Sequence, residues 1–259
     1  GTVASTVEGG AITITNTYDT AQLTITKSFP DNNLPEDKRG GITFTVTGGD
    51  LTSPIVKTYG DFTNGSLTLT QADGIKVGAT YTVTETNADV NGYSRTTTYK
   101  VNGEATAHEY TDAGASVTTT GGTGSVEHIN NYALGRLVIT KTFAGNATPD
   151  NTQKSAIRFT VTGVSTDDAT KDYTATFAYG TNTDNATWTD TTNGKILTIT
   201  GLKLGSYTVT ESGDVYTDSN GKAEYIHSVK YTVGSTERTT NGTVASTVEG
   251  GAITITNTY

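Results

Sequence analysis

Apolar and polar residues alternate along most of the chain, and Thr fills many of the polar positions. The alternation is clear in residues 23–27, 42–46 and 67–69. A period of two places successive side chains on opposite faces of a β-strand. Asn-Gly pairs, which favour type I′ hairpin turns, occur at residues 64–65, 91–92, 102–103, 193–194, 220–221 and 241–242. The pattern therefore predicts an all-β protein built from short strands and tight turns.

One long segment occurs twice without change. The sequence GTVASTVEGGAITITNTY at residues 1–18 recurs at 242–259. Identity over such a length indicates a tandem array with a period of 241 residues, because a shared strand pattern alone does not preserve every residue. We therefore assign residues 1–18 to the last strand of a preceding repeat.

A second, diverged repeat lies inside this period. AQLTITKSF at 21–29 matches GRLVITKTF at 135–143, and later strands match in the same order. This predicts two homologous domains, residues 19–133 and 134–259. The spacing of strands and turns fits an immunoglobulin-like (Ig-like) β-sandwich, so the expected fold class is two tandem sandwiches.

Proline marks two breaks in the strand pattern. Pro35 and Pro149 are each expected to open one short helical turn, because proline fits the first turn of a helix. Thr148 is the expected N-cap of the second turn.

Composition and charge limit the cellular environment and the classes of binding partner that fit this chain. The chain contains neither Cys nor Met, so no disulfide or thiol chemistry is available. Its net charge is −9, and the 17 basic residues are dispersed, which argues against nucleic acid as a partner. No apolar run is long enough to span a membrane. These features favour an extracellular surface protein.

Three polar residues in each predicted domain stand in phase with apolar neighbours, on the strand face that should be buried. In the first domain they are Lys27, Glu85 and Asn130, and in the second Lys141, Glu211 and Asn257. The competing interpretation is three polar residues at strand ends that face solvent. The same trio in the same order and phase in both domains favours burial.

A buried trio of this kind has a specific chemistry. Burial lowers the pKa of a lysine and raises that of a glutamate, so the amine becomes a neutral nucleophile and the carboxyl a proton donor. The glutamate is expected to donate a hydrogen bond to the amide oxygen of the asparagine and to transfer protons as ammonia leaves. The product is a Lys–Asn isopeptide bond between the first and last strands. Each domain reacts once, without turnover, and the sequence contains no motif of an enzyme, cofactor or metal site.

The motifs ITKSF and ITKTF, YTVTE, and a terminal I-x-N-x-Y resemble those of CnaB-type (Cna protein B-type) domains of Gram-positive adhesins and related pilin isopeptide-linkage domains. The resemblance covers both predicted domains. It implies a Lys27–Asn130 bond promoted by Glu85, and a Lys141–Asn257 bond promoted by Glu211.

Two positions depart from the pattern in the first domain. INNY replaces ITNTY, so Asn131 competes with Asn130, although alignment through the lysines and the apolar phase select Asn130. His128 takes the position that Ile255 has in the second domain. Its expected role is a partly covered side chain at the end of the sandwich, and the alternative is that it tunes the first bond.

The predicted function is a structural stalk repeat of a bacterial surface adhesin, attached to the cell wall through regions outside this chain. Its partners are neighbouring repeats of the same chain, with any host ligand bound through other domains. One alternative is a pilus backbone subunit polymerised by a sortase. Another is a ligand-binding adhesin domain that uses Trp188, although a core position for Trp188 is preferred. Asp214, Asp218 and Asn220 have the wrong spacing for a calcium loop, and we interpret this segment as a hairpin turn.

Overall fold

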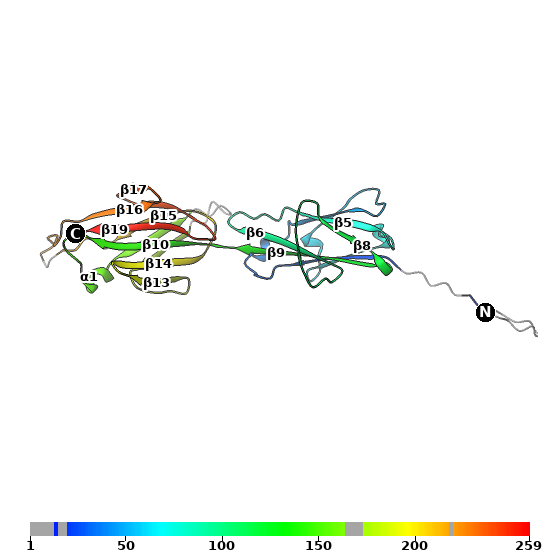
Figure 1. Cartoon of the computed structure of the whole chain (residues 1–259), viewed down its shortest axis with the longest axis horizontal. Helices are drawn as coiled ribbons and strands as arrows, with labels where there is room; N and C mark the ends of the chain where they lie inside the picture. Colours follow the sequence, from blue (N-terminus) through cyan, green and yellow to red (C-terminus); the bar gives the residue numbers. More distant parts are fainter. Residues whose placement is uncertain (1–12, 15–19, 164–172, 218–219) are drawn as a thin grey trace, which may run out of the picture. The chain divides into compact units, whose positions relative to one another are not determined.

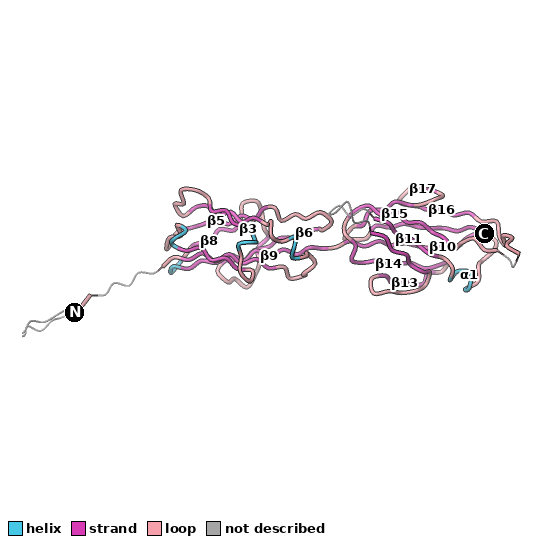
Figure 2. The backbone as a smooth tube through the Cα atoms, turned by 180° about the vertical axis from the view of Figure 1, so that it is seen from behind, coloured by secondary structure: helices cyan, strands magenta, loops and turns pink. Residues whose placement is uncertain are grey.

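The structure is a computed structural model, and it describes residues 13–14, 20–163, 173–217 and 220–259. The chain divides into two compact units. The first comprises the described residues up to Ser28, Arg39–Ala88 and Thr97–Ile129, and the second comprises Phe29–Lys38, Asp89–Thr96 and Asn130–Tyr259. Strands make up most of both units, and the helical segments are short (Figure 2).

The N-terminal sandwich has two sheets. The first has five strands in the order β4 (Ser66–Thr70), β1 (Gln22–Ser28), β9 (Thr123–Ala133), β6 (Ser94–Val101) and β7 (His108–Glu109). The second has four, in the order β3 (Ile55–Thr58), β2 (Thr43–Gly48), β5 (Thr80–Thr86) and β8 (Ala115–Thr118).

The C-terminal sandwich repeats this plan. Its first sheet has the order β13 (Ala186–Thr191), β14 (Gly194–Leu202), β10 (Gly135–Ala144), β19 (Gly251–Thr258), β16 (Ser228–Val233) and β17 (Thr236–Arg238). Its second sheet has the order β12 (Tyr173–Ala178), β11 (Arg158–Gly163), β15 (Gly205–Ser212) and β18 (Gly242–Ser246). The prediction of an all-β chain with two tandem sandwiches is confirmed.

The alternation in the sequence determines which face of each strand is buried. In β1, Leu23, Ile25 and Lys27 are buried, whereas the Thr residues between them are only half-buried. β-Branched Thr is well suited to this second face, because it favours extended backbone and tolerates water. A low apolar content is therefore compatible with a continuous core.

The two sheets of the C-terminal sandwich share one hydrophobic core. Leu137 and Ile139 of β10 belong to the same cluster as Phe159 and Val161 of β11. Because β10 and β11 lie in different sheets, the inward faces of the sheets pack against each other, as in other β-sandwiches.

The first and last strands of each sandwich are neighbours and run parallel. In the N-terminal sandwich β1 pairs with β9, with Lys27 opposite His128. In the C-terminal sandwich β10 pairs with β19, with Lys141 opposite Ile255, and the two strands run side by side (Figure 1). Equivalent registers place the two predicted lysines at the same level of their sandwiches.

Both predicted helical turns are present. A 3-10 turn, η1 (Glu36–Lys38), follows Pro35 directly, and the helix α1 (Asn151–Ser155) follows Pro149. The predicted N-cap Thr148 is wrong, because Asp150 caps α1 by accepting a hydrogen bond from the backbone N–H of Gln153. The remaining 3-10 turns are η2 (Tyr59–Asp61), η3 (Gln71–Asp73) and η4 (Thr120–Gly122).

The duplicated segment 242–259 forms two strands rather than one. Its first part is β18 in one sheet and its second part is β19 in the other. Residues 247–250, which include Glu249 and Gly250, separate the two strands. The assignment of residues 1–18 to a preceding repeat lies outside the described residues, except for Thr13 and Ile14.

Candidate cross-linking sites

The C-terminal sandwich brings its three predicted residues together. Lys141 extends from β10, Glu211 from β15 in the opposite sheet, and Asn257 from β19. One oxygen of the Glu211 carboxyl group, Oε2, lies 3.1 Å from Lys141 Nζ. The other, Oε1, accepts a hydrogen bond of 2.6 Å from Asn257 Nδ2. A single carboxyl group thus bridges the amine and the amide.

Burial favours the neutral forms of this pair. The Lys141 and Asn257 residues are 0% exposed, and the Glu211 side chain is 1% exposed. Burial lowers the pKa of Lys141 to about 8, although the nearby Glu211 charge opposes the shift. Burial also raises the pKa of Glu211, against the opposing effect of Lys141. The two shifts bring the lysine and glutamate pKa values closer, which favours proton transfer from Nζ to the carboxylate.

The orientation of the Asn257 amide differs from the sequence-based expectation. The glutamate was expected to donate to the amide oxygen, whereas Glu211 faces the amide nitrogen. The same nitrogen contacts the hydroxyl of Tyr259 at 3.2 Å. In this arrangement the carboxyl group is adjacent to the amide nitrogen, so it is placed to deliver a proton to that atom.

The N-terminal sandwich contains an equivalent lysine–glutamate pair. Lys27 Nζ lies 3.1 Å from Glu85 Oε2, and both side chains are fully buried. Lys27 also donates a hydrogen bond of 3.5 Å to the backbone oxygen of His128. The backbone of Glu85 is held by Tyr110, whose hydroxyl accepts from the Glu85 N–H at 2.6 Å. The lysine and glutamate therefore meet in both sandwiches at the same separation.

Asn130 lies on β9 two residues beyond His128, and it belongs to the second compact unit. It is 0% exposed, whereas its rival Asn131 is only half-buried. The strand registers pair His128 with Lys27 and Ile255 with Lys141, so Asn130 occupies the position that Asn257 has in the second sandwich. Burial and register thus favour Asn130 over Asn131.

His128 is not the partly covered side chain that the sequence predicted. It is 0% exposed, because the rings of Phe44 and Tyr110 pack edge-on against it at 5.5 Å and 5.4 Å. Its Nδ1 lies 4.0 Å from Glu85 Oε2. Burial, and to a smaller extent the charge of Lys27, lowers the pKa of His128 to about 3. The histidine is therefore neutral at ordinary pH and lines the first site.

Sequence reasoning assigned no role to the tyrosine that follows each asparagine by two residues. Asn130 Nδ2 donates to the Tyr132 hydroxyl at 3.4 Å, and Asn257 contacts Tyr259 in the same way. The signal was present in the sequence, because Asn-x-Tyr occurs at both sites with identical spacing.

A histidine–aspartate contact, with both side chains largely covered, also lies beside the second site. His227 Nε2 is 2.8 Å from Asp214 Oδ2, and the His227 ring stacks on Tyr259 with centroids 5.0 Å apart. Asp214, one of the residues considered for a calcium loop, thus contacts a histidine. Asp218 of that segment lies outside the described residues. The antiparallel bridge between Thr217 and Ala223 fits the preferred hairpin turn.

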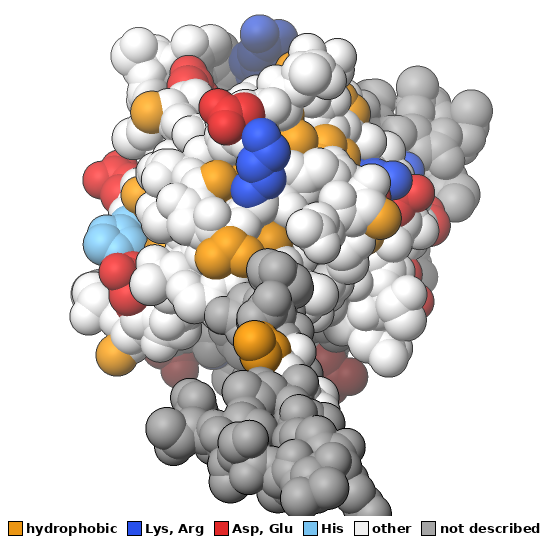
Figure 3. Space-filling view, turned by 90° about the vertical axis from the view of Figure 1, so that its right-hand side faces the viewer, with side chains coloured by type: hydrophobic (Ala, Val, Ile, Leu, Met, Phe, Trp, Pro, Cys, Tyr) orange, Lys and Arg blue, Asp and Glu red, His pale blue; other side chains and the backbone are white. Residues whose placement is uncertain are grey.

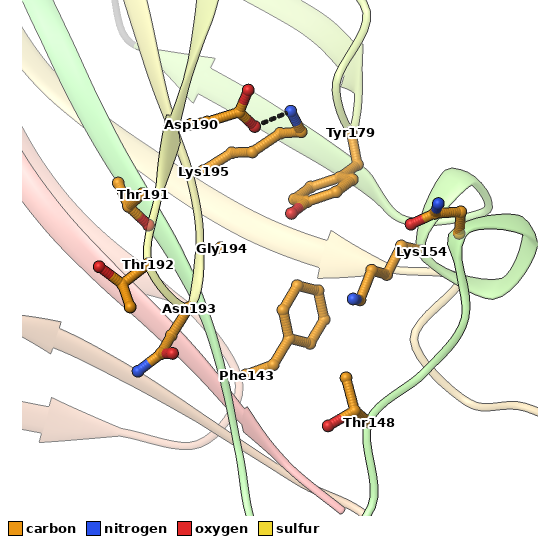
Figure 4. A pocket seen from close by; sticks show the side chains of 11 residues that line it. Phe143, Thr148, Lys154, Tyr179, Asp190, Thr191, Thr192, Asn193, Gly194 and Lys195 are labelled. Atoms are coloured by element: carbon orange, nitrogen blue, oxygen red, sulfur yellow. Dashed lines mark hydrogen bonds and ion pairs between the residues drawn. The ribbon is translucent and has the colours of Figure 1, made fainter.

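A cavity of about 380 Å³ adjoins the second site. Figure 4 shows Phe143, Lys154 and Tyr179 around it, with Asp190 paired to Lys195 at its edge. Lys154 Nζ lies 5.1 Å from the Phe143 ring centroid, and Lys141 Nζ lies 5.0 Å from the same centroid. The Phe143 ring therefore contacts both the buried amine and a cavity-lining lysine.

The structure also bears on ligand binding through Trp188, on metal binding and on membrane insertion. Trp188 packs against the core, with ring centroids 5.6 Å from Phe159 and 5.1 Å from Tyr179. Within the described residues, no cluster of three or more His, Asp or Glu side chains is arranged to hold a metal ion. No helix among them is long and apolar enough to cross a membrane. On the face drawn in Figure 3, acidic and basic side chains are interspersed.

Comparison with known proteins gives one family match and several similar structures. A family described as Domain of unknown function (DUF5979) matches residues 23–133. No curated protein matches the chain.

Three solved structures illustrate the similarity. The major pilin protein T3.2 of Streptococcus pyogenes is 16% identical with a TM-score of 0.47, covering 93% of this chain and 98% of the pilin. A C-terminal fragment of the pilus adhesin SpaC of Lactobacillus rhamnosus is 14% identical with a TM-score of 0.45, covering 93% and 97%. An adhesin of Mobiluncus mulieris containing intramolecular disulfide, isopeptide and ester bond cross-links is 14% identical with a TM-score of 0.35, covering 92% and 99%.

Proposed function

We propose that this chain is a structural stalk segment of a bacterial cell-surface adhesin, and that each sandwich is closed by a self-formed Lys–Asn isopeptide bond. The observation that carries the proposal is the Glu211 carboxyl group, which bridges the amine of Lys141 and the amide of Asn257 inside a closed core. Lys27, Glu85 and Asn130 perform the same reaction in the N-terminal sandwich.

The geometry of the second site supports the following sequence of steps. Lys141 passes a proton to Glu211, and the neutral Nζ attacks Cγ of Asn257. A Cγ–Nζ bond forms and the Cγ–Nδ2 bond breaks. A second Nζ proton is lost as Nδ2 gains one through the carboxyl group and leaves as ammonia. The products are a secondary amide, ammonia and a protonated Glu211, so atoms and charge balance.

The position of the bond suits a protein under tension. The bond joins β10 to β19, which are adjacent and parallel, so the chain enters β10 at one end of the pair and leaves β19 at the other. Pulling on the chain therefore shears this ladder of hydrogen bonds. A covalent tie carries the load around the ladder, and unlike a disulfide it resists reduction. This arrangement favours a load-bearing stalk over a domain that turns over a substrate.

The position of Trp188 also favours a structural role over direct ligand binding. An exposed Trp188 was the main reason to consider a ligand-binding domain, and its ring instead packs against Phe159 and Tyr179. We place the segment outside the cell, joined to the cell wall through other parts of the protein.

The intact mass of the denatured protein tests the proposal. Each bond expels one ammonia, about 17 Da, and unfolding does not reverse the loss. The wild type should lack two ammonias, and Glu85→Ala and Glu211→Ala should each lack one. Glu237→Ala is the matched control, because Glu237 forms an exposed pair with Lys230; it should still lack two. A wild-type protein of full calculated mass would exclude the reaction.

A further inference from the structure

We propose that the tyrosine two residues after each asparagine, Tyr132 and Tyr259, is a fourth member of each reaction site that holds the amide nitrogen until it leaves as ammonia. This inference rests on the proposed isopeptide reaction. It assigns a role to residues that neither the lysine–glutamate–asparagine trio nor the fold requires.

The contact lies on the atom that changes most in the reaction. Asn257 Nδ2 donates one hydrogen bond to Glu211 Oε1 at 2.6 Å and another to the Tyr259 hydroxyl at 3.2 Å. An amide held at one point can rotate about its Cβ–Cγ bond, whereas two acceptors on the same nitrogen fix its plane. The hydroxyl thus keeps the leaving nitrogen next to the carboxyl group that supplies its proton.

The same contact occurs in the other site. Asn130 Nδ2 donates to the Tyr132 hydroxyl at 3.4 Å, and Tyr132 is 0% exposed. Two independent copies of one contact, in domains whose sequences have diverged, indicate a shared requirement.

The backbone of each tyrosine is hydrogen-bonded near the point where the lysine strand ends. The Tyr259 N–H donates to Ala144 O at 3.0 Å, and its carbonyl accepts from the Asn146 N–H at 3.0 Å. Gly145 lies between these partners with φ +98°, and a Cβ there would sit 2.1 Å from Tyr259 O. The glycine is therefore needed for the close approach.

The first site uses side chains for the same anchoring. The Tyr132 N–H donates to a carboxylate oxygen of Asp31, and the Tyr132 carbonyl accepts from Asn33 Nδ2 at 2.7 Å. Asp31 and Asn33 follow β1, whereas Ala144 is the last residue of β10 and Asn146 follows it. In both sites, therefore, hydrogen bonds hold the backbone of the tyrosine on both its N–H and its carbonyl side.

The hydroxyl takes part without gaining or losing a proton. It accepts from Nδ2 and donates to the backbone oxygen of Asp214 at 2.8 Å in the second site. Burial raises the pKa of Tyr259, so the hydroxyl stays protonated. Its contribution is to hold the nitrogen while the Cγ–Nζ bond forms and the Cγ–Nδ2 bond breaks.

The test is the rate of bond formation in the full-length chain. The protein is synthesised in a cell-free system, samples are quenched in denaturant, and intact mass with peptide mapping follows each bond over time. Tyr259→Phe should slow the second bond about tenfold and leave the first unchanged, because one hydrogen bond to the reacting amide is lost. Tyr132→Phe should do the reverse.

Tyr225→Phe and Tyr93→Phe are the matched controls. The Tyr225 ring lies 5.6 Å from that of Tyr259, and the Tyr93 ring 6.1 Å from that of Tyr132; each control should form both bonds at the wild-type rate. Circular dichroism of the products, with Trp188 fluorescence for the C-terminal sandwich, checks that each variant folds. Equal rates in the tyrosine variants and the wild type would overturn the inference while leaving the isopeptide bonds intact. A wild type that forms neither bond would instead refute the proposed function.

Discussion

The two sandwiches hold the same lysine–glutamate pair at the same separation, 3.1 Å, but surround it differently. The first site is lined by the neutral imidazole of His128, whereas the second has Ile255 at the equivalent register position. The lysine–glutamate geometry that allows proton transfer is thus the same in both sandwiches. The neighbouring side chain is titratable in the first sandwich and aliphatic in the second. If the proposed reaction occurs, this comparison predicts that the trio and its tyrosine control the rate of bond formation, and that the neighbouring position controls the pH dependence of stability.

The largest expected difference between the sandwiches comes from breaking one cross-link at a time. Asn257→Ala prevents the second bond and should lower the free energy of unfolding of the C-terminal sandwich by about 4–5 kcal/mol, the value expected for a closed loop of about 100 residues. Trp188 is the only Trp in the chain and packs in that sandwich, so its fluorescence during denaturation measures the effect. Asn130→Ala should leave the Trp188 transition unchanged.

Asn131→Ala provides the control for the first site. Asn131 is adjacent to Asn130 but only half-buried, so this variant should still lose two ammonias. A deficit of one ammonia in Asn131→Ala, with two in Asn130→Ala, would reverse the assignment of the reacting asparagine.

The next effect is a difference in acid sensitivity. The pKa of His128 is lowered to about 3 from an ordinary value of 6.5, so the unfolded state binds a proton at a higher pH than the folded state. The stability that depends on neutral His128 is complete above pH 6.5 and is lost as the pH falls towards 3. At pH 5 the loss should be about 2 kcal/mol.

Calorimetry of the Asn130→Ala, Asn257→Ala double variant at pH 7 and pH 5 would measure this loss without the cross-links. His128→Ile should abolish the additional acid sensitivity of the N-terminal sandwich. Ile255→His is the reciprocal variant and should transfer it to the transition followed by Trp188. Equal acid sensitivity of both sandwiches in the double variant would contradict the assignment.

Much of this architecture was predictable because burial in a sandwich follows from alternation. Lys27 and Lys141 share strand phase with apolar neighbours, and the structure buries both. The prediction failed where the environment depends on segments distant in sequence, here β2 of the opposite sheet and the residue that follows β7. Nothing local to His128 indicates that Phe44 and Tyr110 cover it, so it was expected to be partly exposed.

The second kind of failure concerns the orientation of groups. The sequence analysis predicted that Glu211 contacts Asn257, but through the amide oxygen. In the structure Glu211 contacts the amide nitrogen instead. The choice depends on where Tyr259 lies, and that position is set by backbone contacts with Ala144 and Asn146. Such contacts leave no periodic signal in a sequence.

The next prediction concerns the pH dependence of the rate at which the second bond forms. The reactive state carries one proton shared by Lys141 and Glu211. Above about pH 8, the pKa of Lys141, this proton is lost and no acid remains to protonate the leaving nitrogen. The second bond should therefore form about tenfold more slowly for each pH unit above this value. At low pH both groups are protonated and the amine is not nucleophilic, so the rate should fall again. Quenched mass measurements between pH 5 and 10 test this, and a rate that keeps rising above pH 9 would contradict it.

The smallest expected effect concerns the turn that follows each lysine strand. In the C-terminal sandwich Asp150 and Gln153 form a capping box, with hydrogen bonds of 2.8 Å and 2.9 Å between side chain and backbone. Asp150→Ala should lower the stability of this sandwich by about 1 kcal/mol, seen as a shift in the Trp188 transition of the Asn257→Ala background. Thr148→Ala is the matched control and should have a smaller effect, because Thr148 does not cap α1. If Thr148→Ala had the larger effect, the cap would be Thr148 as the sequence first indicated. The expected result shows instead that proline locates the turn, whereas the residue that caps it is determined by the local backbone.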